Sequence, residues 1–273
     1  MVSQPFYLAI EGVIGVGKTT LARLLQPRFD ADLLLEVFEE NPFLTDFYSD
    51  RERYSFQTQI FFLHSRYRQQ QGIALESRPL IADYTFAKDR LFARLNLGGE
   101  ELAMYERLHQ ALAEKVTRPD LVLYLQADLD VLLARITMRD RPYERQMDPT
   151  YIEALRQAYE QHFAAYHDAP LLVIDANTLN FVRYPKDLDK TEQQIRSALC
   201  KREAHSCGEV FSTHEPLSPS WPLVDQFLAL TEKVGALGAI LAADPRGVSP
   251  SFHSTLDKLE VCLQRLAAGS ENR

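Results

Sequence analysis

Residues 12–19 read Gly-Val-Ile-Gly-Val-Gly-Lys-Thr and match the pattern G-x-x-x-x-G-K-[ST]. In this pattern, glycines let successive backbone N–H groups curl around phosphate oxygens, and the following helix adds its positive N-terminal end. An apolar run precedes the motif and a helical sequence follows it, which is the context that the motif requires. The chain is therefore expected to place a strand, a glycine turn and a helix around a nucleoside triphosphate. The motif leaves open whether the partner is a small molecule, a protein or water.

Two side chains of the motif have specific expected tasks. The Lys18 ammonium can reach the β- and γ-phosphates, and the Thr19 hydroxyl can be placed on Mg²⁺. The residues expected to bind the nucleotide here are Gly12, Gly15, Val16, Gly17, Lys18, Thr19 and Thr20.

Apolar runs alternate with helical stretches over the first 200 or so residues. Strands are expected over residues 6–10, 33–38, 80–82, 121–125 and 171–174, and helices over residues 18–25, 54–71, 100–116 and 150–166. Continuous apolar runs are typical of a parallel sheet that helices cover on both faces. The alternation predicts βαβ units, and hence an α/β fold with a five-stranded parallel sheet.

This pattern changes near residue 203. Residues 203–220 have little periodicity, while residues 222–242 and 251–268 are helical in pattern and are separated by Asp-Pro-Arg-Gly, a good turn sequence. We therefore expect a domain over residues 1–202, a linker over 203–221 and a small helical hairpin appendage over 222–268.

Charge and cysteine content restrict the partners. The chain has 30 Lys and Arg against 38 Asp and Glu, a net charge of −8. A net-acidic protein is a poor candidate for coating nucleic acid or for binding membranes through basic residues. Its three cysteines lack metal-site spacing and do not suggest a disulfide framework, which fits a reducing cytoplasm. We expect no nucleic-acid partner, no membrane partner and a cytoplasmic location.

Further segments narrow the class of protein. Residues 10–20, 36–43, 47–48 and 55–57, in this order and spacing, resemble the deoxynucleoside kinase family, in particular its bacterial deoxyadenosine/deoxyguanosine kinase branch. The resemblance covers residues 5–200. It implies a P-loop kinase closed by an arginine lid, which transfers the ATP γ-phosphate, with Mg²⁺, to the 5′-hydroxyl of a deoxynucleoside in nucleotide salvage. It also implies a purine acceptor and a homodimer formed through long helices.

Glu36 matches the general base of this family, which takes the proton from the nucleoside 5′-hydroxyl. A carboxylate at the carboxyl end of a strand lies on the ligand side of an open α/β sheet. There it can activate an alcohol for in-line attack on the γ-phosphate. A lone glutamate at a strand end is more often structural or merely solvated, but the surrounding motif favours the catalytic assignment.

Asp83 matches the acidic residue of the family's Glu/Asp-Arg-Ser motif, near Mg²⁺ and the phosphates, and would share the metal with Thr19. The alternative for Asp83 is a helix N-cap. The next residue is Tyr84, where many family members have arginine. If that arginine holds the base carboxylate and a phosphate, another cation must replace it. The candidates are Lys88, Arg90 and Arg94.

Three arginines, Arg135, Arg139 and Arg141, resemble the family's arginine lid. Guanidinium groups bind phosphate oxygens in a bidentate fork, so such a segment can close over the donor and stabilise the charge of transfer. The position of the segment favours a lid over a solvated charge run, and Arg139 and Arg141 are expected to be catalytic. Glu144 and Tyr48 match the residues that contact the sugar 3′-hydroxyl.

The resemblance also implies a pocket for the base. Gln57 matches the glutamine that hydrogen-bonds the nucleobase, because an amide is both donor and acceptor. Phe92 is the candidate for stacking on the base, with plain core packing as an equal alternative. Purine-reading relatives pair an arginine with an aspartate, which here implies Asp89 together with either Arg66 or His64.

The C-terminal helices faintly resemble an all-α NTP pyrophosphatase of the MazG type. Such enzymes hold Mg²⁺ with acidic residues three apart on each of two helices. Lys233 and Ala236 occupy the first expected pair, and Asp257 and Glu260 are available for the second. We expect a non-catalytic hairpin, and an unrelated helix pair that packs on the kinase or another subunit is the alternative.

Two other functions compete with a nucleoside kinase. A nucleoside monophosphate kinase of the thymidylate kinase type would need basic residues for the acceptor phosphate, whereas residues 36–40 are rich in glutamate. A non-catalytic nucleotide-sensing protein would retain the loop but not the chemistry, and Tyr84 keeps this alternative open.

Overall fold

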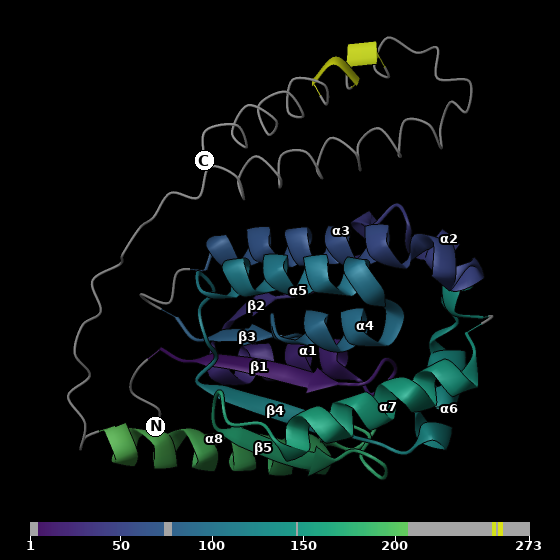
Figure 1. Cartoon of the computed structure of the whole chain (residues 1–273). Coiled ribbons are helices and arrows are strands. Elements are labelled where there is room, and N and C mark those ends of the chain that lie inside the picture. The colour runs from purple at the N-terminus through teal and green to yellow at the C-terminus, as the bar shows by residue number, and fades with distance from the viewer. Residues whose placement is uncertain (1–4, 74–77, 146, 207–252, 255, 259–273) are drawn as a thin grey trace.

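The computed structural model describes residues 5–73, 78–145, 147–206, 253–254 and 256–258. These residues form an α/β fold around a five-stranded sheet in the order β2-β3-β1-β4-β5, with every neighbouring pair parallel (Figure 1). The predicted five-stranded parallel sheet is thus confirmed. Residues 203–206 of the expected linker belong to a helix that ends at Ser206, and residues 253–254 and 256–258 of the expected appendage are described. The rest of both segments lies outside the described residues.

All the strands lie where apolar runs predicted them, with one marked difference in length. The strands are β1 (Tyr7–Gly12), β2 (Asp32–Leu34), β3 (Leu80–Ala82), β4 (Leu121–Gln126) and β5 (Leu171–Asp175). The expectation of a strand over residues 33–38 is wrong at its end, because β2 stops at Leu34. Beyond it, the backbone N–H of Glu36 donates to a side chain, Asp83 Oδ1, at 2.8 Å instead of to a neighbouring strand.

The helices are α1 (Lys18–Phe29), α2 (Leu44–Ser49), α3 (Arg51–Gln71), α4 (Lys88–Asn96), α5 (Gly99–Ala113), α6 (Leu129–Arg139), α7 (Pro149–Ala164) and α8 (Pro185–Ser206). Short 3₁₀ turns span Phe38–Glu40 and Pro142–Glu144. Figure 1 shows α3 and α5 side by side beyond the β2 edge of the sheet, and α8 along the β5 edge. Helix α8 continues past residue 202 to Ser206.

Two apolar cores fix the elements that carry polar side chains. The first lies around β1 and β4 and includes Leu8, Ile10, Leu21 and Leu123, each fully buried. The second joins α3, α4 and α5 through residues that include Leu63, Ala93, Tyr105 and Leu112. Helices α3 and α4 are therefore held relative to each other independently of the central sheet. Within the described residues, no helix combines the length and apolar character needed to cross a bilayer.

Candidate active site

The phosphate-binding loop joins β1 to α1, as the motif predicted, and two of its glycines admit no side chain. Gly12 has φ +147°, and a Cβ atom there would lie 2.6 Å from the Leu125 carbonyl oxygen. Gly15 has φ +89°, and its Cβ would lie 2.7 Å from the Ile136 side chain. The loop therefore packs directly against β4 and α6, which leaves its other side facing a cleft of about 350 Å³.

Lys18 lies at the centre of this loop. Its Nζ donates hydrogen bonds to the carbonyl oxygens of Gly12, at 2.7 Å, and Val13, at 3.2 Å. Burial, with the positive charge of Lys88 nearby, lowers the pKa of Lys18 to about 8. The ammonium is therefore poorly solvated at the loop, where an anionic ligand would favour its charged form.

Thr19 and Asp83 meet beside the loop, as the resemblance implied. Thr19 Oγ1 donates to Asp83 Oδ2 at 2.5 Å, and Asp83 Oδ1 accepts from the Glu36 N–H. The alternative role of Asp83 as a helix N-cap is wrong, because α4 begins only at Lys88, after Ala87. A hydroxyl and a carboxylate next to phosphates are ligands of the kind that Mg²⁺ prefers.

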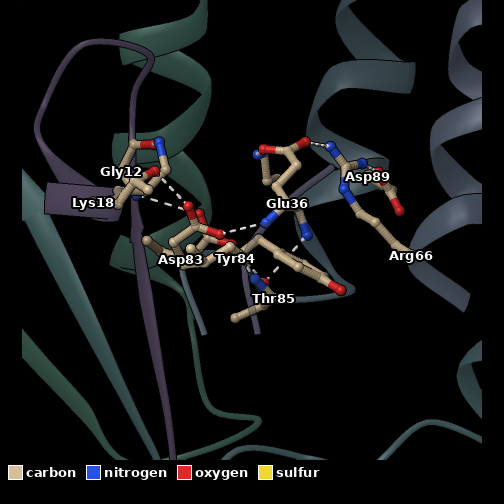
Figure 2. Close-up of polar contacts among 12 residues, drawn as sticks. Gly12, Lys18, Glu36, Arg66, Asp83, Tyr84, Thr85 and Asp89 are labelled. Carbon is tan, nitrogen blue, oxygen red and sulfur yellow. Dashed lines mark hydrogen bonds and ion pairs between the residues drawn. The ribbon is translucent and has the colours of Figure 1, made fainter. Parts of the chain in front are cut away.

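Glu36 follows the carboxyl end of β2 and pairs with two cations, Arg66 and Lys88, of which Figure 2 shows Arg66 beside its carboxylate. Lys88 Nζ donates to Glu36 Oε2 at 2.6 Å, and the Arg66 guanidinium donates to Oε1. Burial by itself would raise the pKa of Glu36, but the charges of Arg66 and Lys88 outweigh it and hold that pKa well below its usual range. Glu36 is therefore an ionised carboxylate at any pH near neutral.

Of the three cations considered as replacements for the arginine after Asp83, Lys88 is the one at Glu36. Its side chain is only 4% exposed. Arg90 and Arg94 instead pair with Glu106 on α5 and are 44% and 57% exposed. Lys88 comes from the first turn of α4, one turn after Tyr84, so a different position in the chain supplies the cation.

A buried carboxylate that the sequence analysis missed, Glu11, ties these segments together. Its oxygens accept hydrogen bonds from Thr85 N at 2.6 Å, Thr85 Oγ1 at 2.9 Å, Gly12 N at 3.2 Å and the Tyr159 hydroxyl at 3.2 Å. Glu11 therefore fixes the turn after β3 relative to the phosphate-binding loop. The available signal was a charged residue at the end of an otherwise apolar strand.

The arginine segment runs from the last turns of α6 into the turn that follows it, and Arg139 and Arg141 form one wall of the cleft. Arg139 donates to both oxygens of Glu144, with distances of 2.7–3.1 Å, and Arg141 lies 3.6 Å from the same carboxylate. Arg141 also lies over the Phe38 ring, 4.0 Å from its centroid. Tyr143 stacks on Tyr48 with ring centroids 5.9 Å apart. Glu144 and Tyr48 thus both line the cleft, and their contact with the sugar 3′-hydroxyl stays a prediction.

Arg135 does not line the cleft with the other two arginines. Its guanidinium donates to the carbonyl oxygens of Val16, Ala176 and Leu179 at 2.8–2.9 Å. It therefore joins the phosphate-binding loop to the segment after β5, and its direct contact with ATP stays a prediction.

The assignment of the base-reading glutamine is corrected by two positions. Gln57 is exposed on α3, whereas Gln59 is 2% exposed and lines the cleft. Two residues correspond to a turn of about 200° around a helix, which places Gln57 on the other side. Arg66, two turns after Gln59, lies on the same face, so the spacing from Arg66 was a usable signal.

Of the remaining predicted base-pocket residues, some line the cleft and one lies behind a residue that does. Arg66, rather than His64, lines the cleft, as does Phe92. Asp89 lies behind Arg66, fully buried and ion-paired with it. Figure 2 shows Arg66 with Glu36 and Asp89 on either side of its guanidinium. Of the predicted site residues, the cleft gathers Gly15, Gly17, Lys18, Thr19, Thr20, Glu36, Tyr48, Arg66, Asp83, Phe92, Arg139, Arg141 and Glu144.

This cleft opens at the carboxyl ends of parallel strands, with a phosphate-binding loop after β1 and an ionised carboxylate after β2. Basic side chains from α3, α4 and the segment after α6 face the same space. These features define a P-loop kinase. A family model for deoxynucleoside kinases matches residues 8–201, well over half of the chain. The chain belongs to the deoxynucleoside kinase family, whose members are ATP-dependent phosphotransferases.

Individual relatives agree with this assignment. The chain is 33% identical over 207 residues to the deoxyguanosine kinase of Bacillus subtilis, covering 73% of this chain and 100% of that protein. It is 28% identical over 200 residues to the deoxyadenosine/deoxycytidine kinase of the same organism, covering 70% and 92%. A solved structure of deoxyadenosine kinase from M. mycoides has the same fold, with a TM-score of 0.63 and 24% identity over 70% of this chain and 98% of that chain.

The family match ends at residue 201. The resemblance of the C-terminal helices to MazG-type pyrophosphatases receives no support from it. The residue pairs considered there lie almost entirely outside the described residues.

Proposed function

We propose that the protein phosphorylates the 5′-hydroxyl of a deoxypurine nucleoside, deoxyguanosine or deoxyadenosine, in nucleotide salvage. The observation that carries the proposal is Glu36, an ionised carboxylate that lies in one cleft with Lys18 and Thr19 of the phosphate-binding loop. A purine is supported by the amide of Gln59 and by the paired Arg66 and Asp89, and by the identity to a deoxyguanosine kinase.

In the proposed reaction, the nucleoside O5′ attacks the γ-phosphorus of ATP. The new O5′–phosphorus bond forms as the bond between the γ-phosphorus and the β,γ-bridging oxygen breaks. Glu36 accepts the O5′ proton, and ADP leaves. Lys18, Arg139 and Arg141 stabilise the negative charge on the transferring group. Thr19 and Asp83 would hold the Mg²⁺ that accompanies ATP and neutralises phosphate charge.

Aromatic residues form the acceptor side of the cleft. Phe92 offers a face to the base, and Lys88 lies 5.5 Å from its ring centroid. Tyr48 and Glu144 would contact the sugar 3′-hydroxyl. A sugar between these residues would place its 5′-carbon toward Glu36 and the phosphate-binding loop, which is the arrangement that in-line transfer requires.

The competing functions are less well supported. A monophosphate kinase needs free basic groups for its acceptor phosphate, but Lys88 and Arg66 are both paired with Glu36. A sensing protein needs no base, whereas Glu36 is held by several specific contacts. The family match also favours a nucleoside acceptor.

We further propose a kinase domain over residues 1–202 that acts as a homodimer in the cytoplasm. The matched range, 8–201, supports the domain limits. The dimer rests on the family resemblance, and the cytoplasmic location on the cysteine content. Light scattering of the whole protein at micromolar concentration tests the dimer.

A panel assay tests the proposed function directly. Purified protein is incubated with ATP and Mg²⁺ and with each of the four deoxynucleosides or dTMP, and nucleotide products are separated. We expect deoxyguanosine or deoxyadenosine to give monophosphate with the highest kcat/KM. Diphosphate formed from dTMP alone would identify a monophosphate kinase, and a folded, ATP-binding protein without any product would favour a sensor.

The variant Glu144→Gln tests the contact to the sugar. We expect the KM for the deoxynucleoside to rise about fivefold, because a neutral amide oxygen replaces the charged acceptor of the 3′-hydroxyl and a hydrogen bond to a charged group is worth about 1 kcal/mol more than a neutral one. The KM for a 2′,3′-dideoxynucleoside, which lacks the 3′-hydroxyl, should change little. An equal rise for both would mean that Glu144 acts only by holding Arg139. Asp140→Asn is the matched control, because Asp140 pairs with Arg145 at an exposed position of the same segment.

A further inference from the structure

The peptide group between Leu35 and Glu36 is held on both sides by side chains. Gln69 Nε2 donates to the Leu35 carbonyl oxygen at 2.9 Å. On the opposite side, the Glu36 N–H donates to Asp83 Oδ1 at 2.8 Å. This peptide lies just beyond β2, where the sheet ladder has ended, so these two side chains take the place of a strand partner.

Tyr84 determines which way the Gln69 amide faces. The Tyr84 hydroxyl donates to Gln69 Oε1 at 2.9 Å, and burial raises the pKa of Tyr84, so the hydroxyl keeps its proton. With its oxygen engaged in this way, the amide presents its NH₂ group to the Leu35 carbonyl. Reversing the amide would set its oxygen against that carbonyl oxygen. Tyr84 is fully buried, so no water competes for the contact.

We propose that Tyr84 is a positioning residue for Glu36, acting through Gln69. Two consecutive residues, Asp83 and Tyr84, then hold the peptide group between Leu35 and Glu36. Asp83 accepts directly from its N–H, and Tyr84 acts on its carbonyl through Gln69. Figure 2 shows Asp83 and Tyr84 beside the backbone of Glu36. The role of the peptide in catalysis rests on the proposed function, but its geometry does not.

The reason for such a support lies in the carboxylate itself. Arg66 on α3 attracts the Glu36 carboxylate to the side away from Gly12 and Lys18 of the phosphate-binding loop (Figure 2), and Lys88 on α4 pairs with the same carboxylate. A fixed backbone limits how far the carboxylate can follow them. Loss of the Tyr84 hydroxyl frees the Gln69 amide to turn, and the Leu35 carbonyl loses its partner.

The test is Tyr84→Phe, which removes one oxygen atom and keeps the ring. We expect kcat for the deoxynucleoside to fall about tenfold, as expected for the loss of one buried hydrogen bond, with the KM for ATP unchanged within twofold. The matched control is Tyr105→Phe. Tyr105 is also fully buried, and its hydroxyl has no hydrogen-bond partner among the described residues. An equal fall in kcat in both variants would overturn the proposal.

A double-mutant cycle separates this relay from general loss of packing. If Tyr84 acts through Gln69, then Tyr84→Phe combined with Gln69→Leu lowers kcat no further than Gln69→Leu alone. Independent roles would make the two losses multiply, and that result would refute the relay.

A second readout does not depend on turnover. Amide hydrogen exchange at Glu36 should be faster in Tyr84→Phe than in wild type, and unchanged in Tyr105→Phe. If the wild type phosphorylates no deoxynucleoside, the proposed function fails while the exchange experiment still decides whether Tyr84 fixes the peptide. Unchanged exchange in Tyr84→Phe would overturn the inference, even in an active kinase.

Discussion

Glu36→Gln is expected to lower kcat for the deoxynucleoside by about 10³-fold, within the range typical of a lost general base. Glutamine has nearly the same shape but cannot take the O5′ proton. It also carries no charge, so Lys88 and Arg66 keep hydrogen-bond partners but lose their counter-ion. Nucleoside and ATP should still bind, because the loop and the base pocket are unchanged. Calorimetric titration and steady-state kinetics of the same preparation check both parts.

The matched control for this variant is Glu40→Gln. Glu40 belongs to the same acidic segment but is exposed and does not line the cleft. Its turnover should stay within twofold of wild type. Turnover of Glu36→Gln within a few-fold of wild type would show that another group, or solvent, accepts the proton, and the assignment of the base would be wrong.

Arg66→Met is expected to reduce the free energy of unfolding by about 3–5 kcal/mol, because removal of a buried cation leaves uncompensated carboxylates. Arg66 is 4% exposed and pairs with both Glu36 and Asp89, of which Asp89 is fully buried. Urea unfolding followed by circular dichroism measures the change. The double variant Arg66→Met with Asp89→Leu should recover part of the loss, because it also removes the unpaired carboxylate.

The same variant should change the pH dependence of kcat. In wild type, the pKa of Glu36 is well below its ordinary value of 4.5, so its contribution to stability is present above that pH and is lost only as the pH falls further. Without Arg66, burial still raises the pKa and only Lys88 opposes it. The acidic limb of the pH–kcat profile should therefore move to higher pH, with kcat near neutral pH about 100-fold lower from misplacement of the base. An unmoved limb would mean that Lys88 alone sets this pKa.

The sequence predicted those parts of the site whose residues are close together in the chain as well as in space. The phosphate-binding loop lies within one strand–turn–helix unit, so its residues could be assigned directly. Strand positions followed from continuous apolar runs. The end of β2 could not be predicted, because it depends on a side chain 47 residues away, Asp83, that takes the N–H of Glu36.

Residues on helices were harder to place, for two different reasons. Gln57 was assigned to the base on resemblance alone, although the helical relation to Arg66 places Gln59, and not Gln57, on the face of α3 that lines the cleft. Helix α4 was not predicted as an element, because it is short and begins at Lys88, after Ala87, without a side-chain cap. The contact of Lys88 with Glu36 therefore could not be separated from the other candidates, Arg90 and Arg94, which point toward α5.

The strand order has a consequence for how such a kinase diversifies. The helices that carry the base pocket, α3 and α4, lie with β2 and β3 on one side of β1, while β4, β5, α6 and the Arg135 contacts lie on the other (Figure 1). Substitutions that alter the choice of nucleoside can therefore accumulate on one half of the molecule while the half that binds the common phosphate donor stays the same. New acceptor preferences can therefore arise from substitutions in α3 and α4 at positions other than Arg66 and Lys88, which hold Glu36, while the phosphate-binding loop stays unchanged.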